Sequence, residues 1–230
     1  YTFCVFVVPT GVYHGSHPVR ALILDDFDRA APRGTGHAKV GGNYAPVLRW
    51  SGAAKRDGYG ITLHLDSAAR RDIDEFSTSG FIGAKTAGDA VTLVVPDSRC
   101  VIDSVTSDSI QHVARSWGWA VERRAIPYHE LPSFSEVFAA GTAAALVPIR
   151  SITRRRSGGD AGLPAGPRVS STAEDDTVTY IPEGTDEAGP LCLRLLTHLQ
   201  AIQLGKVPDE FGWRCEVTEG DLDVEGAELP

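Results

Sequence analysis

Residues 39–46, with the sequence KVGGNYAP, place a lysine inside a glycine-rich loop. Gly34 and Gly36 precede this lysine and a glycine pair follows it, and glycine lets a backbone come close to a bulky planar ligand. Neither common phosphate-loop motif is formed, because Lys39 comes before the glycine pair instead of after it, and Gly34-x-Gly36 lacks a third glycine at the required spacing. Taken alone, such a lysine is more often structural than functional, so the rest of the chain has to decide its role.

Lysine is rare in this chain, which makes Lys39 easy to compare with the others. Only four of the 22 basic residues are lysines. Lys55 lies at the expected end of a helix, Lys206 follows a glycine that ends a helix, and Lys85 opens a hairpin turn. These three are ordinary surface positions, so Lys39 is the candidate reactive amine.

Composition and charge exclude several classes of function. The 230 residues carry a formal net charge of −8, whereas a nucleic-acid partner requires a basic face. No apolar run approaches the roughly 18 residues that a membrane-spanning helix needs, so we expect no membrane partner. Cys4, Cys100, Cys192 and Cys215 are scattered without metal-ligand spacing, so we expect neither a metal site nor a disulfide framework. This cysteine usage favours a reducing, intracellular compartment.

Hydrophobic periodicity predicts many short strands and few helices. The expected strands cover residues 1–9, 19–24, 61–65, 120–126 and 137–140, with a hairpin formed by residues 74–85 and 91–95. The expected helices cover residues 44–57, 107–117 and 188–204. This mixture predicts an α+β fold with one domain at residues 1–217, which includes a flexible surface loop at residues 154–177. The acidic residues 218–230 are expected to form a disordered tail.

Three further motifs follow the lysine loop in a definite order. They are DEFST at residues 74–78, IDSVTSDS at 102–109 and EVFAAGTAA at 136–144. All four motifs together resemble, in order and spacing, those of the fold-type IV pyridoxal-phosphate enzymes, and specifically the branched-chain amino acid aminotransferases of eukaryotic type. The likeness runs from the first expected strand through residues 211–213.

This resemblance implies a fold and a set of partners. The fold is the family's large, cofactor-binding domain, in which mixed β-sheets form a pseudo-barrel flanked by helices. The family's N-terminal small domain, of about equal length, does not appear in this chain, which has no methionine even at position 1. We therefore expect a piece of a longer protein. Its expected partners are the small domain, from the same gene or a separate chain, and a second copy in a homodimer.

The resemblance also implies the cofactor pyridoxal 5′-phosphate and the residues that hold its ring. Lys39 matches the lysine that forms the Schiff base and then moves the substrate α-proton as general acid and base. Tyr44 matches the tyrosine at the phenolic oxygen, and Glu75 matches the carboxylate that keeps the pyridine nitrogen protonated. The alternatives are a buried aromatic with a satisfied hydroxyl for Tyr44 and a strand-end surface carboxylate for Glu75.

The phosphate and substrate positions follow from the two later motifs. Val105 and Thr106 match the amides that bind the phosphate ahead of a helix, and Thr142 adds a hydroxyl and an amide. Helix capping is the alternative role for the residues around 104–107, and capping is compatible with anion binding. Thr78, Thr142 and the Ala143 amide match the positions that bind the substrate carboxylate.

The implied reaction is transfer of an amino group from a branched-chain L-amino acid to 2-oxoglutarate. The small residues Ser77, Ser79 and Gly80 leave open a class IV transaminase or lyase that acts on another amino acid or amine. A non-catalytic fragment that needs a partner chain is the alternative from a different class of protein, since one fold supports many functions.

Overall fold

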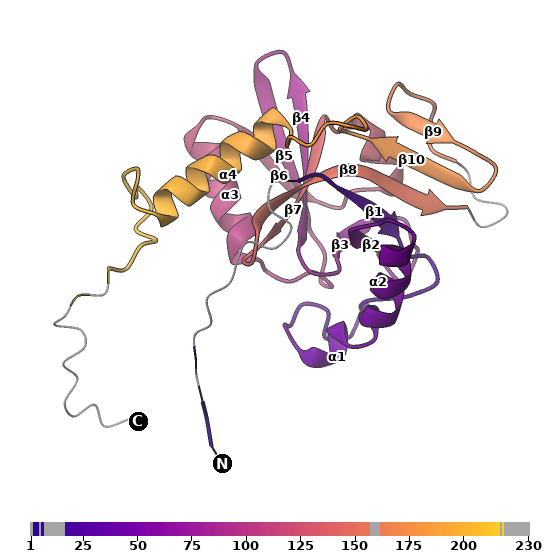
Figure 1. Ribbon diagram of the computed structural model, residues 1–230, viewed down its shortest axis with the longest axis horizontal. Helices are drawn as coiled ribbons and strands as arrows, with labels where there is room; N and C mark the ends of the chain where they lie inside the picture. The colour runs from indigo at the N-terminus through magenta and orange to yellow at the C-terminus, as the bar shows by residue number, and fades with distance from the viewer. Residues whose placement is uncertain (1, 5, 7–16, 157–161, 217, 219–230) are drawn as a thin grey trace.

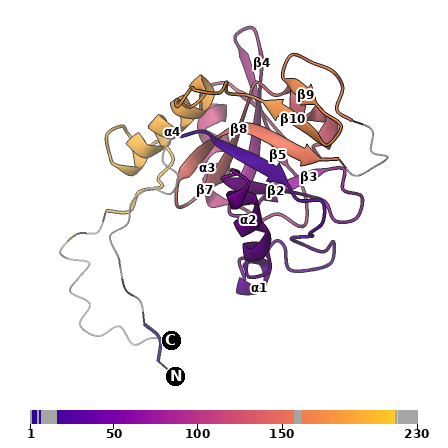
Figure 2. The same cartoon turned by 45° about the vertical axis from the view of Figure 1, so that its right-hand side comes forward.

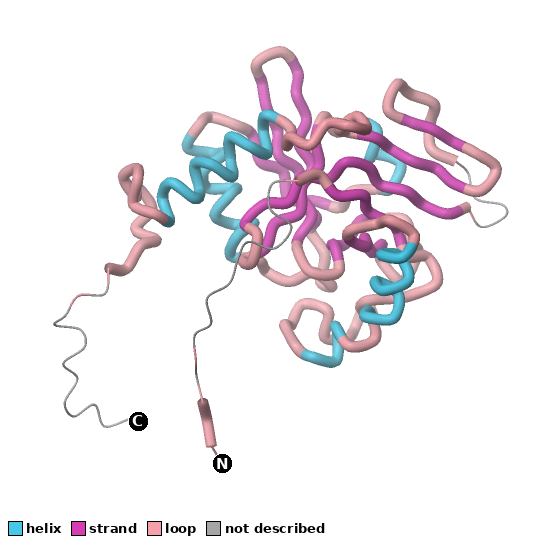
Figure 3. Tube along the Cα trace, in the orientation of Figure 1, coloured by secondary structure: helices cyan, strands magenta, loops and turns pink. Residues whose placement is uncertain are grey.

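The computed structural model describes residues 2–4, 6, 17–156, 162–216 and 218 (Figure 1). Its strands are β1 (Val19–Ile23), β2 (Ile61–Leu65), β3 (Ile73–Phe76), β4 (Gly80–Ala87), β5 (Ala90–Pro96), β6 (Ala120–Arg124), β7 (Glu136–Gly141), β8 (Ala145–Arg155), β9 (Val169–Ser171) and β10 (Asp175–Thr179). Its helices are α1 (Gly41–Tyr44), α2 (Val47–Arg56), α3 (Val105–Ser116), α4 (Pro190–Gln203) and the 3-10 helix η1 (Tyr128–Ser133). The strands lie at the centre and the helices lie around them (Figure 3).

Six of these strands close into a barrel. Their order is β1, β2, β3, β4, β7 and β8, after which β8 pairs with β1 again. Strand β1 is parallel to both of its neighbours, and the other pairs in the ring are antiparallel. Strands β5 and β6 extend the sheet beyond β4, while β10 and β9 extend it beyond β8. The expected α+β fold with a pseudo-barrel is confirmed.

Side chains alternate between the two faces of the barrel wall, as the two-residue period of a strand requires. On β7, Val137 and Ala139 belong to the interior cluster, whereas Phe138 and Ala140 belong to the cluster outside. Helix η1 adds apolar side chains to the interior cluster. The inside of the barrel is therefore a packed core.

Helices α3 and α4 lie together against the outer face of the barrel (Figures 1 and 2). The start of α4 is fixed by Glu136, a buried residue of β7 whose carboxylate accepts the N–H groups of Leu191 at 2.9 Å and Cys192 at 3.0 Å. A carboxylate at a helix N-terminus satisfies amides that have no partner within the helix. Helix α2 packs against β1 and β2 through a third, smaller cluster. No helix among the described residues is long and apolar enough to cross a bilayer.

Most of the expected elements are present, with differences at their ends. The helices expected at residues 107–117 and 188–204 are α3 and α4. The helix expected at residues 44–57 begins at Val47, because Pro46 is its N-cap and the preceding turn forms the separate helix α1. The expected strand at residues 74–85 is interrupted at residues 77–79, where the chain turns between β3 and β4.

The prediction of an irregular loop at residues 154–177 is wrong at both ends of the segment. Strand β8 continues to Arg155, and β9 and β10 lie within the second half of the segment. Ion pairs order this region, since Arg154 pairs with Asp25 at 2.8 Å and Arg156 with Asp176 at 3.2 Å. The sequence did not predict these strands, because short, polar edge strands show little alternation of apolar and polar residues. Residues 157–161, most of the expected strand at residues 1–9, and the expected tail beyond Thr218 lie outside the described residues.

Candidate active site

A cavity of about 200 Å³ lies at one rim of the barrel, beside the turns that join β3 to β4 and β7 to β8. Residues from four separate parts of the chain line it: the lysine loop, strand β3 with the turn after it, the start of α3 and the turn after β7. Among the lining residues are Lys39, Tyr44, Glu75, Thr78, Val105 and Thr142. The fold thus brings together residues from all four sequence motifs.

The loop that carries Lys39 is held by Asn43, a buried residue of α1. The Asn43 side-chain amide donates to the carbonyl oxygens of Thr35 at 2.7 Å and Ala38 at 2.8 Å, and its Oδ1 accepts the Thr35 hydroxyl at 3.0 Å. Lys39 Nζ lies over the Tyr44 ring, 5.4 Å from its centroid. The lysine is therefore exposed to the cavity on a loop whose backbone is fixed.

Gly36 fixes the same loop from the other side. A Cβ atom at this position would lie 2.4 Å from the Ala30 Cβ and 2.6 Å from the Cys100 carbonyl oxygen. Both distances are shorter than any real contact, so the lysine loop approaches the segment before α3 as closely as only glycine allows. By contrast, a Cβ at Gly41 or Gly42 would meet no atom within 4 Å among the described residues beyond its neighbours in the chain and the backbone of its own helix.

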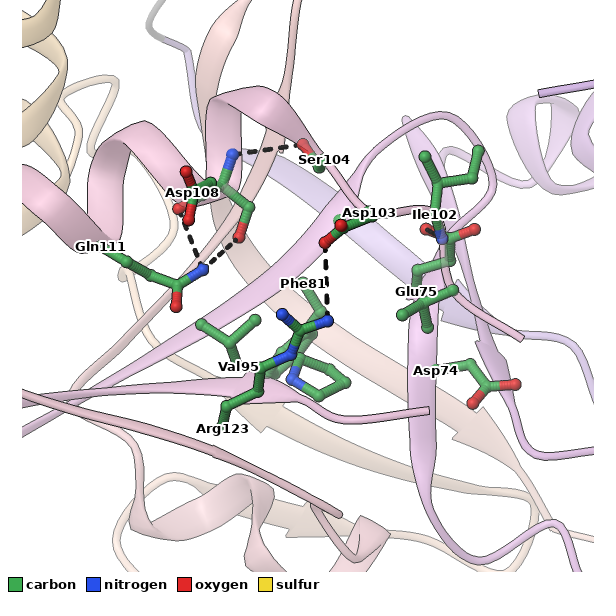
Figure 4. Close-up of a pocket in the computed structure, with 14 residues that line it drawn as sticks. Asp74, Glu75, Phe81, Val95, Ile102, Asp103, Ser104, Asp108, Gln111 and Arg123 are labelled. Atoms are coloured by element: carbon green, nitrogen blue, oxygen red, sulfur yellow. Dashed lines mark hydrogen bonds and ion pairs between the residues drawn. The ribbon is translucent and has the colours of Figure 1, made fainter. Parts of the chain in front are cut away.

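Glu75 is buried on β3, with 4% of its surface exposed. One of its oxygens accepts the Ile102 N–H at 3.3 Å, and Figure 4 shows the two residues side by side. Burial raises the pKa of Glu75 to about 7, against the opposing effects of the Arg29 charge and the Ile102 N–H. The alternative of a strand-end surface carboxylate is wrong. A carboxyl with a pKa near neutrality can share a proton with a ring nitrogen at physiological pH.

Arg29 is the residue at this site that the sequence did not predict. It is 7% exposed and forms an ion pair with Glu75. The same nitrogen, Nη2, donates to the carbonyl oxygens of Gly36 at 3.0 Å and Cys100 at 2.6 Å. Arg29 therefore joins β3, the lysine loop and the segment before α3. No motif marked it, because the burial of an arginine in an irregular segment is visible only once the chain is folded.

The start of α3 supplies free amides at the rim of the cavity. Ser104 is the N-cap residue, and its hydroxyl accepts the Ser107 N–H at 3.2 Å. The first-turn amides of Val105 and Thr106 have no partner within the helix, as is general for helix starts. Helix α3 has 12 residues, and its N-terminus also carries a partial positive charge that favours an anion. Capping and anion binding are thus compatible here.

The two turns that face the start of α3 are packed against each other. A Cβ at Gly141 would lie 3.2 Å from the Ser79 Cβ, so little space separates the turns. The first turn is held from behind by Thr62 of β2, whose hydroxyl donates to the buried Ser77 hydroxyl at 2.8 Å. The Ser77 amide also donates to the Thr62 carbonyl at 2.9 Å. Thr78 and Thr142 therefore project into the cavity from a fixed base.

A second, smaller cavity of about 30 Å³ adjoins the first and shares Glu75 with it (Figure 4). Arg123 of β6 borders it and reaches Asp103 at 3.5 Å. Asp103 also lines the larger cavity, so a carboxylate lies close to the start of α3. Among the described residues, no group of three or more histidine, cysteine, aspartate or glutamate side chains could hold a metal ion.

Two of the residues expected at the site do not line the cavity. Thr106 and Ala143 each follow a lining residue, Val105 and Thr142 respectively, but they are not part of the wall. Both were expected to act through backbone amides, and the roles assigned to all the site residues stay predictions.

The sequence matches the protein family "Amino-transferase class IV" over residues 1–152, which is more than half of the chain. The chain belongs to the class IV aminotransferases. This aminotransferase chain is 50% identical over 223 residues to "Aminotransferase atnJ" of Emericella nidulans, with 95% of the chain and 59% of that protein covered. It is 45% identical to "Branched-chain amino acid aminotransferase gloG" of Glarea lozoyensis, with 95% of the chain and 57% of that protein covered.

Solved structures show the same fold. The branched-chain amino acid aminotransferase of Escherichia coli is 25% identical, with a TM-score of 0.66 over 87% of this chain and 57% of that one. The branched-chain amino acid aminotransferase of Thermobaculum terrenum, solved in its PLP-containing holo-form, is 21% identical, with a TM-score of 0.62 over 84% of this chain and 53% of that one. The chain spans a little more than half the length of these relatives.

Proposed function

We propose that this chain forms the pyridoxal-phosphate site of an aminotransferase that moves amino groups from branched-chain L-amino acids to 2-oxoglutarate. The observation that carries the proposal is one cavity in which a lysine amine, a buried carboxyl group and a helix N-terminus meet. These three groups match the aldehyde, the ring nitrogen and the phosphate of one cofactor. The cofactor, when bound, supplies a protonated ring that draws electrons from the substrate α-carbon.

The residues of the chain divide the work of holding that cofactor. Lys39 supplies the amine for its aldehyde and moves the substrate α-proton. Tyr44 donates to the phenolic oxygen, and Glu75 faces the ring nitrogen. The amides of Val105 and Thr106, with the hydroxyl and amide of Thr142, bind the phosphate, and Val105 and Thr142 line the same cavity.

The substrate lies on the side of the cavity formed by the two packed turns. Thr78, Thr142 and the Ala143 amide bind its carboxylate. The branched-chain assignment is supported by the relative from Glarea lozoyensis and by the bacterial structural neighbours, which are named branched-chain amino acid aminotransferases. Ser77, Ser79 and Gly80 give this side small, polar surfaces, so an aminotransferase or lyase for another amino acid or amine is the second candidate.

We expect a partner to cover exposed apolar side chains at the cavity. Val105, which lines the cavity, is 79% exposed, and Val40, which follows the lining residue Lys39, is 43% exposed. An N-terminal small domain, from the same gene or a separate chain, would cover them, and a homodimer is the expected assembly. Buried free thiols at Cys100 and Cys192 fit an intracellular location, in the cytoplasm or in mitochondria.

Steady-state transamination tests the proposal. The complete protein, loaded with pyridoxal phosphate, should convert leucine, isoleucine or valine and 2-oxoglutarate into glutamate, and Lys39→Ala should abolish the reaction. Lys55→Ala is the matched control, because Lys55 lies at the exposed end of α2. Activity with other amino acids or amines in place of the branched-chain ones would favour the second candidate. Cofactor binding without any transfer would favour a non-catalytic protein.

A further inference from the structure

A histidine lies inside the fold on the strand next to Glu75. His64 is in the middle of β2 and is 2% exposed. Its neighbours Leu63 and Leu65 belong to the cluster inside the barrel, so His64 faces the opposite side of the sheet. There its ring meets Phe27 edge-on at 6.2 Å, two residues before Arg29. His64 and the Glu75–Arg29 pair thus occupy the same layer between the barrel and the segment that leads to the lysine loop.

His64 and Arg29 both have polar atoms that no other described residue satisfies. Within the described part of the chain, neither ring nitrogen of His64 has a hydrogen-bond partner, and neither has Arg29 Nε. A buried polar group without a partner costs on the order of 1–3 kcal/mol, so such groups usually find one. Burial, and then the nearby charge of Arg29, lower the pKa of His64 to about 3. The imidazole is therefore neutral and offers one acceptor nitrogen, while Arg29 Nε–H is a donor.

The contacts of Arg29 explain why this donor matters. Its interactions with Glu75, Gly36 and Cys100 all use Nη2. These three interactions hold the guanidinium through one nitrogen, whereas Nε has no hydrogen-bond partner among the described residues. A further hydrogen bond at Nε would hold the guanidinium at a second point, and with it the direction of the Glu75 carboxylate.

We propose that His64 is a positioning residue for the cofactor ring: its neutral imidazole accepts the Arg29 Nε–H through one buried water molecule and so holds the guanidinium that orients Glu75. The proposal rests on the proposed function, because it assumes that Glu75 faces the ring nitrogen. A single water with two such polar partners is an ordinary feature of protein interiors. Arg29 is then fixed on both edges, and Glu75 keeps its proton-sharing geometry toward the ring.

Cofactor affinity, measured with and without the ring nitrogen, tests the proposal. The complete holoenzyme is compared for binding of pyridoxal phosphate and of its 1-deaza analogue, which has carbon at that position. Wild type should bind pyridoxal phosphate more tightly than the analogue. His64→Leu and His64→Phe, which lack an acceptor, should weaken pyridoxal-phosphate binding about ten-fold and leave analogue binding unchanged. His64→Gln, which supplies an acceptor, should restore most of the loss.

Leu65→Ala is the matched control, because Leu65 lies on the same strand and points into the barrel. It should lower the melting temperature and leave the affinity ratio of the two ligands as in wild type. If the His64 variants weaken both ligands equally, or neither, His64 only fills space and the proposal is wrong. If wild type itself does not distinguish the two ligands, Glu75 does not face the ring nitrogen, and this proposal fails together with that part of the proposed function.

Discussion

The buried Arg29 guanidinium pairs with the Glu75 carboxylate at the back of the candidate cofactor site. Because Arg29 also donates to the backbone of Gly36 and Cys100, this ion pair connects three segments of the site. We expect the pair to have two separable effects, one on the stability of the fold and one on the chemistry of the ring nitrogen that Glu75 is proposed to face.

Breaking the ion pair should destabilise the chain without cofactor. Arg29→Leu leaves the Glu75 carboxyl without its cation and two backbone carbonyls without a donor, so we expect a loss of about 3–5 kcal/mol in the free energy of unfolding. The double variant Arg29→Leu/Glu75→Gln should lose less than the sum of the two single variants, because no unpaired charge remains buried. Urea unfolding of the four proteins measures this. Additive losses would show that the two side chains do not interact.

Removing the charge of Glu75 should reduce the rate of transamination more than substrate binding. Glutamine keeps the shape and a hydrogen bond, but it cannot keep the ring nitrogen protonated. That proton matters most in the transition state, so kcat should fall by roughly two to four orders of magnitude while KM changes little. The measurement is steady-state kinetics of Glu75→Gln with the absorption spectrum recorded alongside. A kcat within about three-fold of wild type would show that Glu75 is not the partner of the ring nitrogen.

The raised pKa of Glu75 predicts a pH dependence of stability with a definite sign. Between its ordinary value of 4.5 and about 7, the folded chain binds the proton that the unfolded chain has lost. The contribution of Glu75 to the free energy of unfolding should therefore fall by about 3 kcal/mol as the pH rises through this window. His64, with its pKa lowered to about 3, contributes the opposite slope at acid pH up to about 6.5.

The difference between wild type and Glu75→Gln isolates the Glu75 effect, because His64 contributes equally to both. Urea unfolding of the cofactor-free proteins at several pH values between 4.5 and 8 gives this difference. The free energy of unfolding of wild type, minus that of Glu75→Gln, should fall as the pH rises from 4.5 to about 7 and should level off above pH 7. A difference that does not vary with pH would show that Glu75 has an ordinary pKa in the folded chain.

Two glycines of the lysine loop should respond differently to the same substitution. Gly36→Ala places a Cβ against Ala30 and the Cys100 carbonyl, so the loop has to move and both stability and cofactor affinity should fall. Gly41→Ala places a Cβ where no other part of the described chain lies within 4 Å, so stability should stay within about 0.5 kcal/mol of wild type. Thermal unfolding and cofactor titration of both variants check this. Equal thermal destabilisation by both would mean that the loop is not packed as described.

The sequence predicted those parts of the site that local motifs mark. The lysine loop, β3 and the turn after β7 each contain a residue pattern that can be recognised in the sequence alone. The structure brings Lys39, Glu75 and Thr142 from these patterns to one cavity. Strand pairing and ring closure came from the resemblance, because no local pattern shows which strands are neighbours.

The parts that the sequence did not predict depend on burial and long-range contacts. Arg29 is a charged residue in an irregular segment, a setting that normally means solvent exposure, and its partner Glu75 lies 46 residues further on in the chain. His64 alternates with two leucines as any strand residue would, so nothing in the pattern separates it from a surface polar position. The sequence did not predict the break between β3 and β4. The turn there is held by a hydrogen bond between Ser77 and Thr62 of β2, and such a long-range contact leaves no pattern in the sequence.

The central claim is that Lys39 is the amine that holds the cofactor, and borohydride reduction tests it most directly. The complete protein is incubated with pyridoxal phosphate, reduced, digested and mapped by mass spectrometry. We predict one pyridoxyl label, on the peptide that contains Lys39, with none on Lys55, Lys85 or Lys206. A label on one of those three lysines, or no label at all, would contradict the account.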